Sequence, residues 1–505
     1  MTDDLLLGLD LGTTSARAVL TARDGHILAT HAAEYPMHTP HPGWAEQDPD
    51  TWERAAVEAL GACVRAAPDP AAIRGIGLTG QMHGATLLDE RDQSIRPAIL
   101  WCDQRTGAQR QAVERDIGLA EVIARTANPP LEGFTAPKLL WVREHEPDAY
   151  ARIRRVLLPK DFIRLRLTGE AAADVADASG TALFDVAKRK WSEAMARDLE
   201  IPLEWLPRVV ESPETAGALT PAAAEALGLP AGLPVAAGAG DQAAGGVAAG
   251  IVAAGDALVT IGSSGVVFVA GDRPRIDPAG RVHTFCHALP ETWHVMGVTQ
   301  GAGISLRWVR DTLGASDASG GVAYDALTRE AATSPAGSRG LIWLPYLQGE
   351  RTPHLDPNAR GVLFGLTTAH GRGDVVRSVL EGVAFSLRDG LEIIQDLGLP
   401  ARRVKIAGGG ARSPLWRQIV ADVLGLPISL EPEDRGPAFG AALLAGVAVG
   451  VYASVEEACA ATGSRTQEIE PGRDTHAVYE ATYRLYHELY PALADSFARV
   501  ASLQE

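Results

Sequence analysis

The sequence contains little cysteine, and the few cysteines it has are widely spaced. Four occur in 505 residues, at positions 63, 102, 286 and 459, and none forms a Cys-x-x-Cys pair. Zinc sites use closely spaced thiolates, and small secreted proteins use dense cysteine frameworks. The sequence therefore predicts neither a zinc site nor disulfides, and it favours a reducing, cytoplasmic location.

Positive charge and long apolar runs are also scarce. The chain has 46 Lys and Arg against 63 Asp and Glu, a net charge of −17 that repels nucleic acid and anionic lipid. Its beginning, MTDDLLLG, is acidic where a secretory signal would be basic. The weakly polar region 231–270 is interrupted by Asp241, Gln242 and Asp256, which excludes a membrane span there. We expect neither nucleic acid nor a membrane as a partner.

The rest of the composition is typical of a globular protein. Hydrophobic residues make up 46% of the chain and charged residues 22%. Because 505 residues are more than one hydrophobic core usually organises, we expect two or three domains.

A pattern of strand, polar turn and strand occurs twice. LLLGLDLGTTSARAVL, residues 5–20, has two apolar runs around a Thr-Thr-Ser turn, which predicts a β-hairpin. DALVTIGSSGVVFVAG repeats the design, with strands at 257–261 and 266–270 around the turn GSSG. The repetition indicates two similar lobes.

Strands and helices alternate after each hairpin. AIRGIGLTG and RVKIAGGG are typical of strands, whereas DPDTWERAAVEALGACVRAA and DVVRSVLEGVAFSLRDGLEIIQDLG have helical apolar spacing. The sequence thus predicts an α/β fold with lobes at 1–245 and 246–505, divided within the glycine-rich region 234–255. Tyrosines at helical spacing near the C-terminus predict a helix docked on the core.

The two turns suit phosphate groups, because glycines and short hydroxyl residues bring several N–H and O–H donors to one point. Most such turns are only turns. Two facing turns, however, would hold a polyphosphate between Thr13, Thr14 and Gly262–Ser264. Asp10 ends an apolar strand, where a carboxylate is costly unless a cation or donors compensate it, so we expect it to face Mg²⁺. The alternative is that Asp10 caps the turn.

Two further segments follow strands and precede helices. The cluster AGGGA contains Gly409 and Gly410, whose backbone could lie flat against adenosine, although such connections often use glycine for steric reasons. Asp241 in GAGDQAAGG begins a predicted helix, whose dipole would keep its carboxylate ready to accept a proton; an ordinary N-cap is the alternative. The same segment matches the dinucleotide pattern GxGxxA, but Asp256 precedes the next strand instead of ending it, so we discount a dehydrogenase.

Polar residues also follow two apolar runs of the first lobe. LTGQMHGATLLD and ILWCDQRT place Gln81, His83, Asp103 and Arg105 at predicted strand ends, where a polyol could bind. A buried structural histidine and a surface ion pair are the alternatives.

Together these motifs resemble the FGGY family of carbohydrate kinases over nearly the whole chain. The resemblance rests on GLDLGTTSARAVL, HPGWAEQDPDTW, GQMHGATLLD, RPAILWCDQR, GFTAPKLLWVREHEP, LLPKDFIRLRLTGE, FCHALPETWHVMGV, LPYLQGERTPH, GVLFGL, VLEGVAFSLRDG and GGGARSPLWRQIVADVLG. It implies two actin/Hsp70-like (ribonuclease H-like) ATPase lobes with a cleft between them. It also implies ATP-dependent phosphorylation of a sugar hydroxyl.

The resemblance implies roles for individual residues. QMHGAT and GERTPH are similar to the segments of the xylulose-phosphorylating members, so we expect D-xylulose as substrate, with Met82 and His83 as contacts. Asp241 would be the catalytic base and Asp10 the carboxylate on the Mg·ATP side. Phosphates would be held by Thr13, Thr14, Gly262, Ser263 and Ser264, and the nucleoside by Gly409 and Gly410.

The chain departs from the family pattern at two places. GDQAAG replaces the expected GDNAAG, so Gln242 beside the base could move a sugar contact, and ribulose, L-xylulose or xylitol is the alternative substrate. GSSGV replaces GTSGV, which keeps the hydroxyl at Ser263. Nucleotide contacts in 297–308 stay unassigned. A sugar-independent ATPase is the alternative from another class, and a homodimer is the default oligomer.

Overall fold

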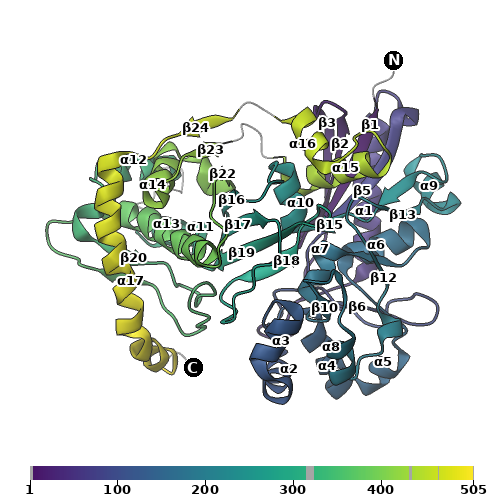
Figure 1. Cartoon of the computed structure of the whole chain (residues 1–505), viewed down its shortest axis with the longest axis horizontal. Helices are drawn as coiled ribbons and strands as arrows, with labels where there is room; N and C mark the ends of the chain where they lie inside the picture. The colour runs from purple at the N-terminus through teal and green to yellow at the C-terminus, as the bar shows by residue number, and fades with distance from the viewer. Residues whose placement is uncertain (1–3, 314–323, 431–434, 464–465, 504–505) are drawn as a thin grey trace.

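A computed structural model describes residues 4–313, 324–430, 435–463 and 466–503 as two lobes, each built on a seven-stranded sheet (Figure 1). The first sheet has the order β13-β14-β5-β1-β2-β3, with β15 also pairing to β5, and the second has the order β18-β19-β17-β16-β22-β23-β24. The first contains β1 (Leu5–Leu11), β2 (Ser15–Ala22), β3 (Ile27–Glu34), β5 (Ile73–Gly80), β13 (Thr215–Ala218), β14 (Pro234–Ala236) and β15 (Ala239–Gly240). The second contains β16 (Asp256–Ile261), β17 (Gly265–Gly271), β18 (His283–Cys286), β19 (Trp293–Thr299), β22 (Arg403–Ala407), β23 (Ile428–Leu430) and β24 (Gln467–Ile469).

Both predicted hairpins are confirmed, and their surroundings match. In the first sheet β1 pairs antiparallel with β2 and parallel with β5. In the second sheet β16 pairs antiparallel with β17 and parallel with β22. Nearly every residue of β1 and of β17 is buried, so both faces of these strands are covered. The repeated sequence pattern therefore corresponds to a repeated sheet.

Helices cover the sheets where the sequence predicts them. In α1 (Pro49–Ala66) the Asp48 side chain caps the N-terminus by accepting from Asp50 N, and Trp52, Ala56 and Leu60 are buried on one stripe. On the second lobe α13 (Arg372–Asp396) and α14 (Pro414–Leu424) form the corresponding cover. None of the helices in the described part of the chain combines the length and apolar character needed to cross a membrane.

Two helices lie between the lobes, α10 (Asp241–Ala248) and α15 (Gly436–Ala448), and they pack on each other (Figure 1). Helix α15 belongs to the second half of the sequence but packs on β1 and β5 of the first sheet. A Cβ atom at Gly8 or Gly77 would lie 1.8 Å from a carbonyl oxygen of α15, that of Ala438 or Ala441. These glycines therefore permit the close contact that joins the halves.

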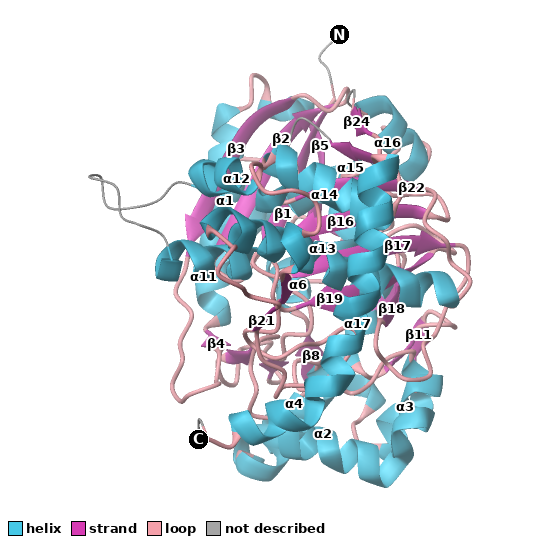
Figure 2. Ribbon diagram, turned by 90° about the vertical axis from the view of Figure 1, so that its left-hand side faces the viewer, coloured by secondary structure: helices cyan, strands magenta, loops and turns pink. Residues whose placement is uncertain are grey.

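The last helix, α17 (Arg473–Ala501), runs along the outside of the second lobe (Figure 2). Tyr479, Tyr483, Tyr486 and Phe497 are buried, which confirms the predicted docking helix. The Tyr479 hydroxyl donates to Glu381 Oε1 at 2.9 Å, and Arg377 pairs with the same carboxylate. The helix is thus a structural part of the second core.

Shorter elements complete the described chain. The helices are α2 (Gly107–Val113), α3 (Leu119–Thr126), α4 (Thr135–His145), α5 (Pro147–Arg152), α6 (Pro159–Thr168), α7 (Val175–Ala178), α8 (Glu193–Asp198), α9 (Pro221–Leu227), α11 (Gly303–Leu313), α12 (Tyr324–Ala331) and α16 (Val455–Thr462). The strands are β4 (Glu46–Gln47), β6 (Thr86–Leu88), β7 (Ala98–Ile99), β8 (Arg155–Leu157), β9 (Ala172–Asp174), β10 (Phe184–Asp185), β11 (Lys190–Trp191), β12 (Arg208–Val210), β20 (Ile342–Leu344) and β21 (Val362–Phe364).

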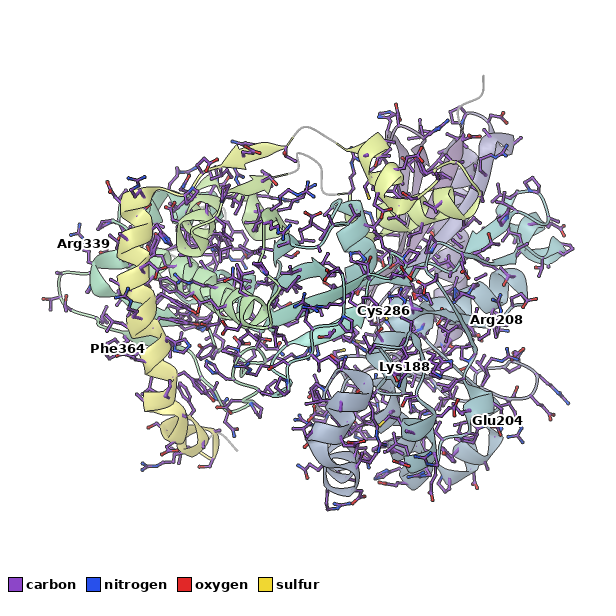
Figure 3. All side chains as sticks on the ribbon, viewed as in Figure 1. Lys188, Glu204, Arg208, Cys286, Arg339 and Phe364 are labelled. Carbon is purple, nitrogen blue, oxygen red and sulfur yellow. The ribbon has the colours of Figure 1, made fainter. Side chains whose placement is uncertain are left out.

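All four cysteines are free thiols. Cys286 lies near the centre of the molecule, where the lobes meet (Figure 3). Its thiol donates to the Val186 carbonyl oxygen at 3.4 Å, so it packs as a buried side chain.

Candidate functional site

Asp10 lies at the end of β1, next to the tip of the first hairpin. Its register partners are Arg17 on β2 and Thr79 on β5. Burial and, second, the charge of Asp241 raise the pKa of Asp10 to about 7, while Arg17 lowers it. Its Oδ1 atom is buried and has no hydrogen-bond partner. The turn-cap alternative leaves this oxygen unsatisfied, whereas a cation would satisfy it.

Asp241 is the first residue of α10, and Gly240 occupies the N-cap position without a side-chain bond. The alternative that Asp241 is an ordinary N-cap is therefore wrong. Burial raises the pKa of Asp241 to about 6, although hydrogen bonds from Gln242 lower it. The two carboxylates, Asp10 from the first hairpin and Asp241 from α10, are close enough to influence each other. A carboxylate with a pKa just below neutrality can accept a proton at physiological pH.

Met82 and His83 lie beside this carboxylate pair. Met82 is buried against Gly240, where a Cβ atom would be 2.8 Å from its Cγ. His83 has a left-handed backbone, with φ +68°, and its carbonyl accepts from Lys138 Nζ at 2.8 Å. Such strain in a residue other than glycine is typical of functional sites.

The ring of His83 is fixed and uncharged. It stacks on Phe134 at 4.5 Å, and its Nδ1 lies 2.6 Å from the Gly180 carbonyl oxygen. Burial lowers the pKa of His83 to about 3. Because a carbonyl can only accept, Nδ1 carries the hydrogen, and Nε2 is left as an acceptor for a hydroxyl.

Gln81, Asp103 and Arg105 are bonded within the first lobe. Asp103 and Arg105 form a fully buried pair at 2.7 Å, so the alternative of a surface pair is wrong. Arg105 also bonds Glu46 at 2.7 Å, and Gln81 donates to Gln47 at 3.1 Å. Neighbouring side chains already bond Asp103 and Arg105, whereas Gln81 Oε1 is buried without a partner. Direct sugar contacts from these three residues stay a prediction.

Trp101 is a candidate that the sequence reasoning missed. Its side chain is 40% exposed, which is unusual for tryptophan, and its Nε1 donates to Thr13 Oγ1 at 3.0 Å. The available signal was an aromatic residue directly before the polar segment CDQR. Trp101 is thus bonded to the tip of the first hairpin.

Each hairpin tip is closed by a hydrogen bond from its first glycine, although the second tip is one residue shorter. Gly12 N donates to Ser15 O at 3.0 Å, and Gly262 N donates to Ser264 O at 3.0 Å. The second tip is also tied to α11, because Gly303 N donates to Gly262 O and Ile304 N to Ser263 O. Each turn thus presents Thr13 and Thr14, or Ser263 and Ser264, at the end of a rigid hairpin.

A cavity of ≈ 430 Å³ lies between the second tip and the predicted nucleoside loop. Gly262 and Ser263 line it with Gly409 and Gly410, although residues 409–412 form a tight 3₁₀ turn and not a flat loop. Gly303, Leu306 and Arg307, which the sequence left unassigned within 297–308, line the same cavity. The size suits a small ligand.

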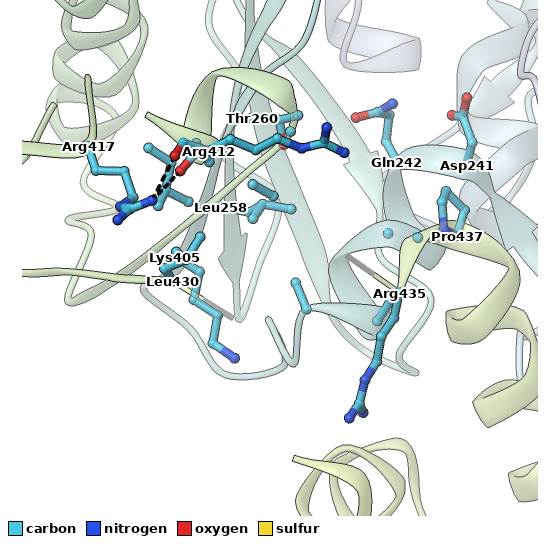
Figure 4. A pocket seen from close by; sticks show the side chains of 18 residues that line it. Asp241, Gln242, Leu258, Thr260, Lys405, Arg412, Arg417, Leu430, Arg435 and Pro437 are labelled. Atoms are coloured by element: carbon cyan, nitrogen blue, oxygen red, sulfur yellow. Dashed lines mark hydrogen bonds between the residues drawn. The ribbon is translucent and has the colours of Figure 1, made fainter. Parts of the chain in front are cut away.

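A second cavity, of ≈ 400 Å³, lies between α10 and the second sheet (Figure 4). Asp241 and Gln242 line one side, and four cationic residues line it as well, namely Lys405, Arg412, Arg417 and Arg435. Arg417 donates to the Ala411 carbonyl oxygen at 2.7 Å, and Arg412 lines both cavities. Positive charge gathered beside the carboxylates of an acidic protein suits a polyphosphate.

Both the sequence and the fold of this chain are similar to those of known proteins. The sequence model of the N-terminal domain of the FGGY family of carbohydrate kinases matches residues 5–248, and that of the C-terminal domain matches 257–449. A xylulose kinase of Escherichia coli K12 is 41% identical over 97% of this chain and 100% of its own length, and one of Bacillus subtilis is 35% identical over 97% of both. Among solved structures, a kinase from Brucella ovis titled xyloylose kinase has a TM-score of 0.92 at 41% identity, covering 97% and 99%. A gluconate kinase from Lactobacillus acidophilus has a TM-score of 0.93 at 27% identity, covering 99% and 100%.

Proposed function

The chain belongs to the FGGY family of carbohydrate kinases, with two actin-like (ribonuclease H-like) lobes, and on this premise we propose that it phosphorylates D-xylulose to D-xylulose 5-phosphate. Kinases of this family use ATP as co-substrate. The xylulose kinases of Escherichia coli and Bacillus subtilis match almost the whole chain, which supports the choice of sugar.

The observation that carries the proposal is the pair of half-buried carboxylates beside a fixed, neutral histidine. Asp10 and Asp241 interact electrostatically, Met82 packs against the residue before Asp241, and His83 follows with a free acceptor nitrogen. To bind a polyol and phosphorylate it, a site needs acceptors for its hydroxyl groups and a base for the hydroxyl that reacts. We propose that His83 Nε2 accepts a hydrogen bond from a sugar hydroxyl.

We propose that Asp241 is the catalytic base. Its carboxylate accepts the proton of the attacking sugar hydroxyl, whose oxygen forms the new bond to the γ-phosphorus as the bond to ADP breaks. Because phosphoryl transfer depends mainly on position and charge neutralisation, a carboxylate with a pKa of about 6 is a sufficient acceptor. Closure of the lobes would exclude water from the site.

We propose that the nucleotide spans the two cavities. Gly409 and Gly410 would contact the nucleoside, and the hairpin tips at Thr13, Thr14, Ser263 and Ser264 would bind phosphates. The unsatisfied Oδ1 of Asp10 fits Mg²⁺, either directly or through water. When bound, the ion would neutralise charge on the phosphates.

We also propose that residues 1–245 and 246–505 are the two closing lobes. The two family matches meet between residues 248 and 257, which supports this division. Helix α15, which packs back on the first sheet, would act as part of the hinge.

The test is ADP release from Mg·ATP with D-xylulose, D- and L-ribulose, L-xylulose, xylitol, glycerol and D-gluconate. We expect kcat/KM to be highest for D-xylulose, by about tenfold or more, since one misplaced hydroxyl leaves buried polar groups unpaired. A higher value for another compound would redirect the substrate assignment. ATP hydrolysis that no sugar stimulates would contradict the proposal.

A further inference from the structure

The motif GERTPH, residues 349–354, contains an arginine that the proposed mechanism does not use. Arg351 lies in the second lobe, in a loop locked onto the end of β19. Its backbone N–H donates to Glu350 Oε1 at 2.7 Å, and Thr352 N donates to Val298 O at 2.9 Å. Glu350 is itself buried and accepts from Gln300 N at 2.8 Å. The position of Arg351 is therefore fixed by the fold.

The guanidinium of Arg351 has no ion pair or hydrogen bond to any residue in the described ranges. Nearby arginines do have partners: Arg281 pairs with Asp277 at 2.9 Å, and Arg110 pairs with Glu132 at 3.0 Å. Burial lowers the pKa of Arg351, although the charges of Glu132 and Glu350 raise it. A partly buried guanidinium without a partner is costly, so its donors are available for a ligand.

The loop of Arg351 lies next to His283 of the second lobe, whose ring is packed toward His83 of the first. Thr352 Oγ1 donates to the carbonyl oxygen of Arg281, two residues before His283, at 2.7 Å. The His283 ring lies 5.9 Å from Phe134, on which His83 stacks. These rings belong to one aromatic group: His83 stacks on Phe134, and His283 stacks on Phe285 at 5.5 Å. The group provides an apolar floor, and Arg351 adds the donors.

The order of residues along the cleft indicates which part of a sugar would reach Arg351. Asp241 follows Gly240, and Gly240 lies against Met82, which precedes His83. Beyond His83 come Phe134, His283 and then the loop that carries Arg351. The hydroxyl that loses its proton must lie at Asp241. The opposite end of the same sugar then points toward Arg351.

We propose that Arg351 is a substrate-binding residue that donates hydrogen bonds to the two oxygens at the sugar end remote from Asp241. For a 2-ketopentose phosphorylated at O5, these are the C1 hydroxyl and the C2 carbonyl oxygen. A guanidinium presents two parallel N–H donors, which matches two adjacent oxygens, whereas His83 supplies an acceptor. The inference rests on the proposed function, because it takes the substrate to be a ketose with its reacting hydroxyl at Asp241.

The inference also assigns Arg351 a part in bringing the lobes together. Arg351 comes from the second lobe, whereas Met82 and His83 come from the first. A sugar bound by all three would contact both lobes at once, and the lobe closure that excludes water would depend on it.

The test compares Arg351→Gln and Arg351→Lys with the whole wild-type enzyme. We expect the KM for D-xylulose to rise about 10- to 100-fold in Arg351→Gln and by less in Arg351→Lys, which keeps one donor group. The KM for ATP should change by less than about twofold, since Arg351 lines neither nucleotide cavity. Arg281→Gln is the matched control, because Arg281 is a neighbouring arginine already paired with Asp277, and its KM for the sugar should stay at the wild-type value.

A sugar analogue separates binding from a structural role. Because 1-deoxy-D-xylulose lacks one of the two proposed acceptors, Arg351→Gln should weaken its use about threefold less than that of D-xylulose. An equal penalty for both sugars, an unchanged sugar KM, or equal rises in the sugar and ATP KM values would overturn the inference. If Arg351→Gln does not fold, Arg351→Lys decides by the same criteria.

A different measurement, the sugar panel of the wild-type enzyme, would show a failure of the proposed function. If that panel selects a different ketose, the same variants are measured with the selected sugar. An unchanged KM in the variants would then overturn the role of Arg351 alone.

Discussion

The two sheets have the same strand arrangement but different surfaces toward the helices between the lobes. In the first sheet, Gly8 and Gly77 are register partners, and α15 packs directly on them. At the same offset from the second hairpin tip, Leu258 and Lys405 are register partners, and they line the cavity beside α10. Equivalent positions thus hold glycine where a helix packs and large side chains where space is open.

The hairpin tips differ in charge in a similar way. Asp10 precedes the first tip, and Thr260 stands at the same offset before the second. The strand partner of Asp10 is Arg17, whereas that of Thr260 is Val266. The duplicated fold therefore carries ionic chemistry on one hairpin and only neutral donors on the other. This difference shows that the topology is shared while each half has its own role.

The largest expected effect is on kcat, and it comes from the helices between the lobes. Helix α10 begins with a carboxylate, whereas α15 begins with glycine and proline. Asp241→Asn should lower kcat about 10³-fold or more, because it removes the proton acceptor and keeps the shape. Single-turnover ADP formation measures the effect. Gln242→Asn, a neighbouring change that keeps an amide, should stay within about tenfold of wild type. Turnover near the wild-type rate in Asp241→Asn would refute the base assignment.

The second effect concerns the packing of the first sheet. Gly8→Ala should destabilise the protein by about 3 kcal/mol, because the new methyl group would meet the Ala438 carbonyl oxygen at 1.8 Å. Leu258→Ala, at the equivalent position, should cost about 1 kcal/mol or less because its side chain lines an open cavity. Urea unfolding compares the two variants. Equal losses would show that the two faces do not differ as described.

The third effect concerns the charge of the first hairpin. Asp10→Asn should reduce kcat/KM about 10²-fold and raise the Mg²⁺ concentration needed for half-maximal activity. Thr260→Val, the matched change in the second hairpin, should reduce kcat/KM by less than about tenfold. Titration of activity with Mg²⁺ measures both. An unchanged magnesium requirement in Asp10→Asn would contradict a metal-facing role.

The smallest effect is the pH dependence of stability without ligands. The pKa of Asp10 is raised from 3.8 to about 7, so between these values the folded state holds more protons than the unfolded state. The contribution of Asp10 to the free energy of unfolding is fully present below pH 3.8, its unfolded pKa, and is lost as the pH rises through about 7. Asp10→Asn should therefore lose about 1–2 kcal/mol less than wild type between pH 5 and 6, with Thr260→Val behaving like wild type. Parallel curves for wild type and Asp10→Asn, in thermal unfolding, would contradict the raised pKa.

The sequence predicted most of the regular elements because their signals are local. Both hairpins follow from apolar runs around Gly-Thr-Thr and Gly-Ser-Ser turns, and α1 follows from Asp48, Pro49 and a helical stripe. The N-cap alternative for Asp241 failed because a cap is decided by backbone geometry, and Gly240 takes that position. Trp101 and Arg351 were not assigned, since a single aromatic residue or arginine has no periodic signal.

The sequence by itself determined the α/β class, the two hairpins and the family, and it singled out Asp10 and Asp241 as candidates, because each rests on a contiguous motif. Only the tertiary structure decided what those motifs face. It buried the Asp103–Arg105 pair, fixed the free nitrogen of His83, packed α15 on the first sheet, and bonded the loop of Arg351 to β19. The physical reason is that burial, pKa and hydrogen-bond partners depend on residues distant in sequence, which only folding brings into contact.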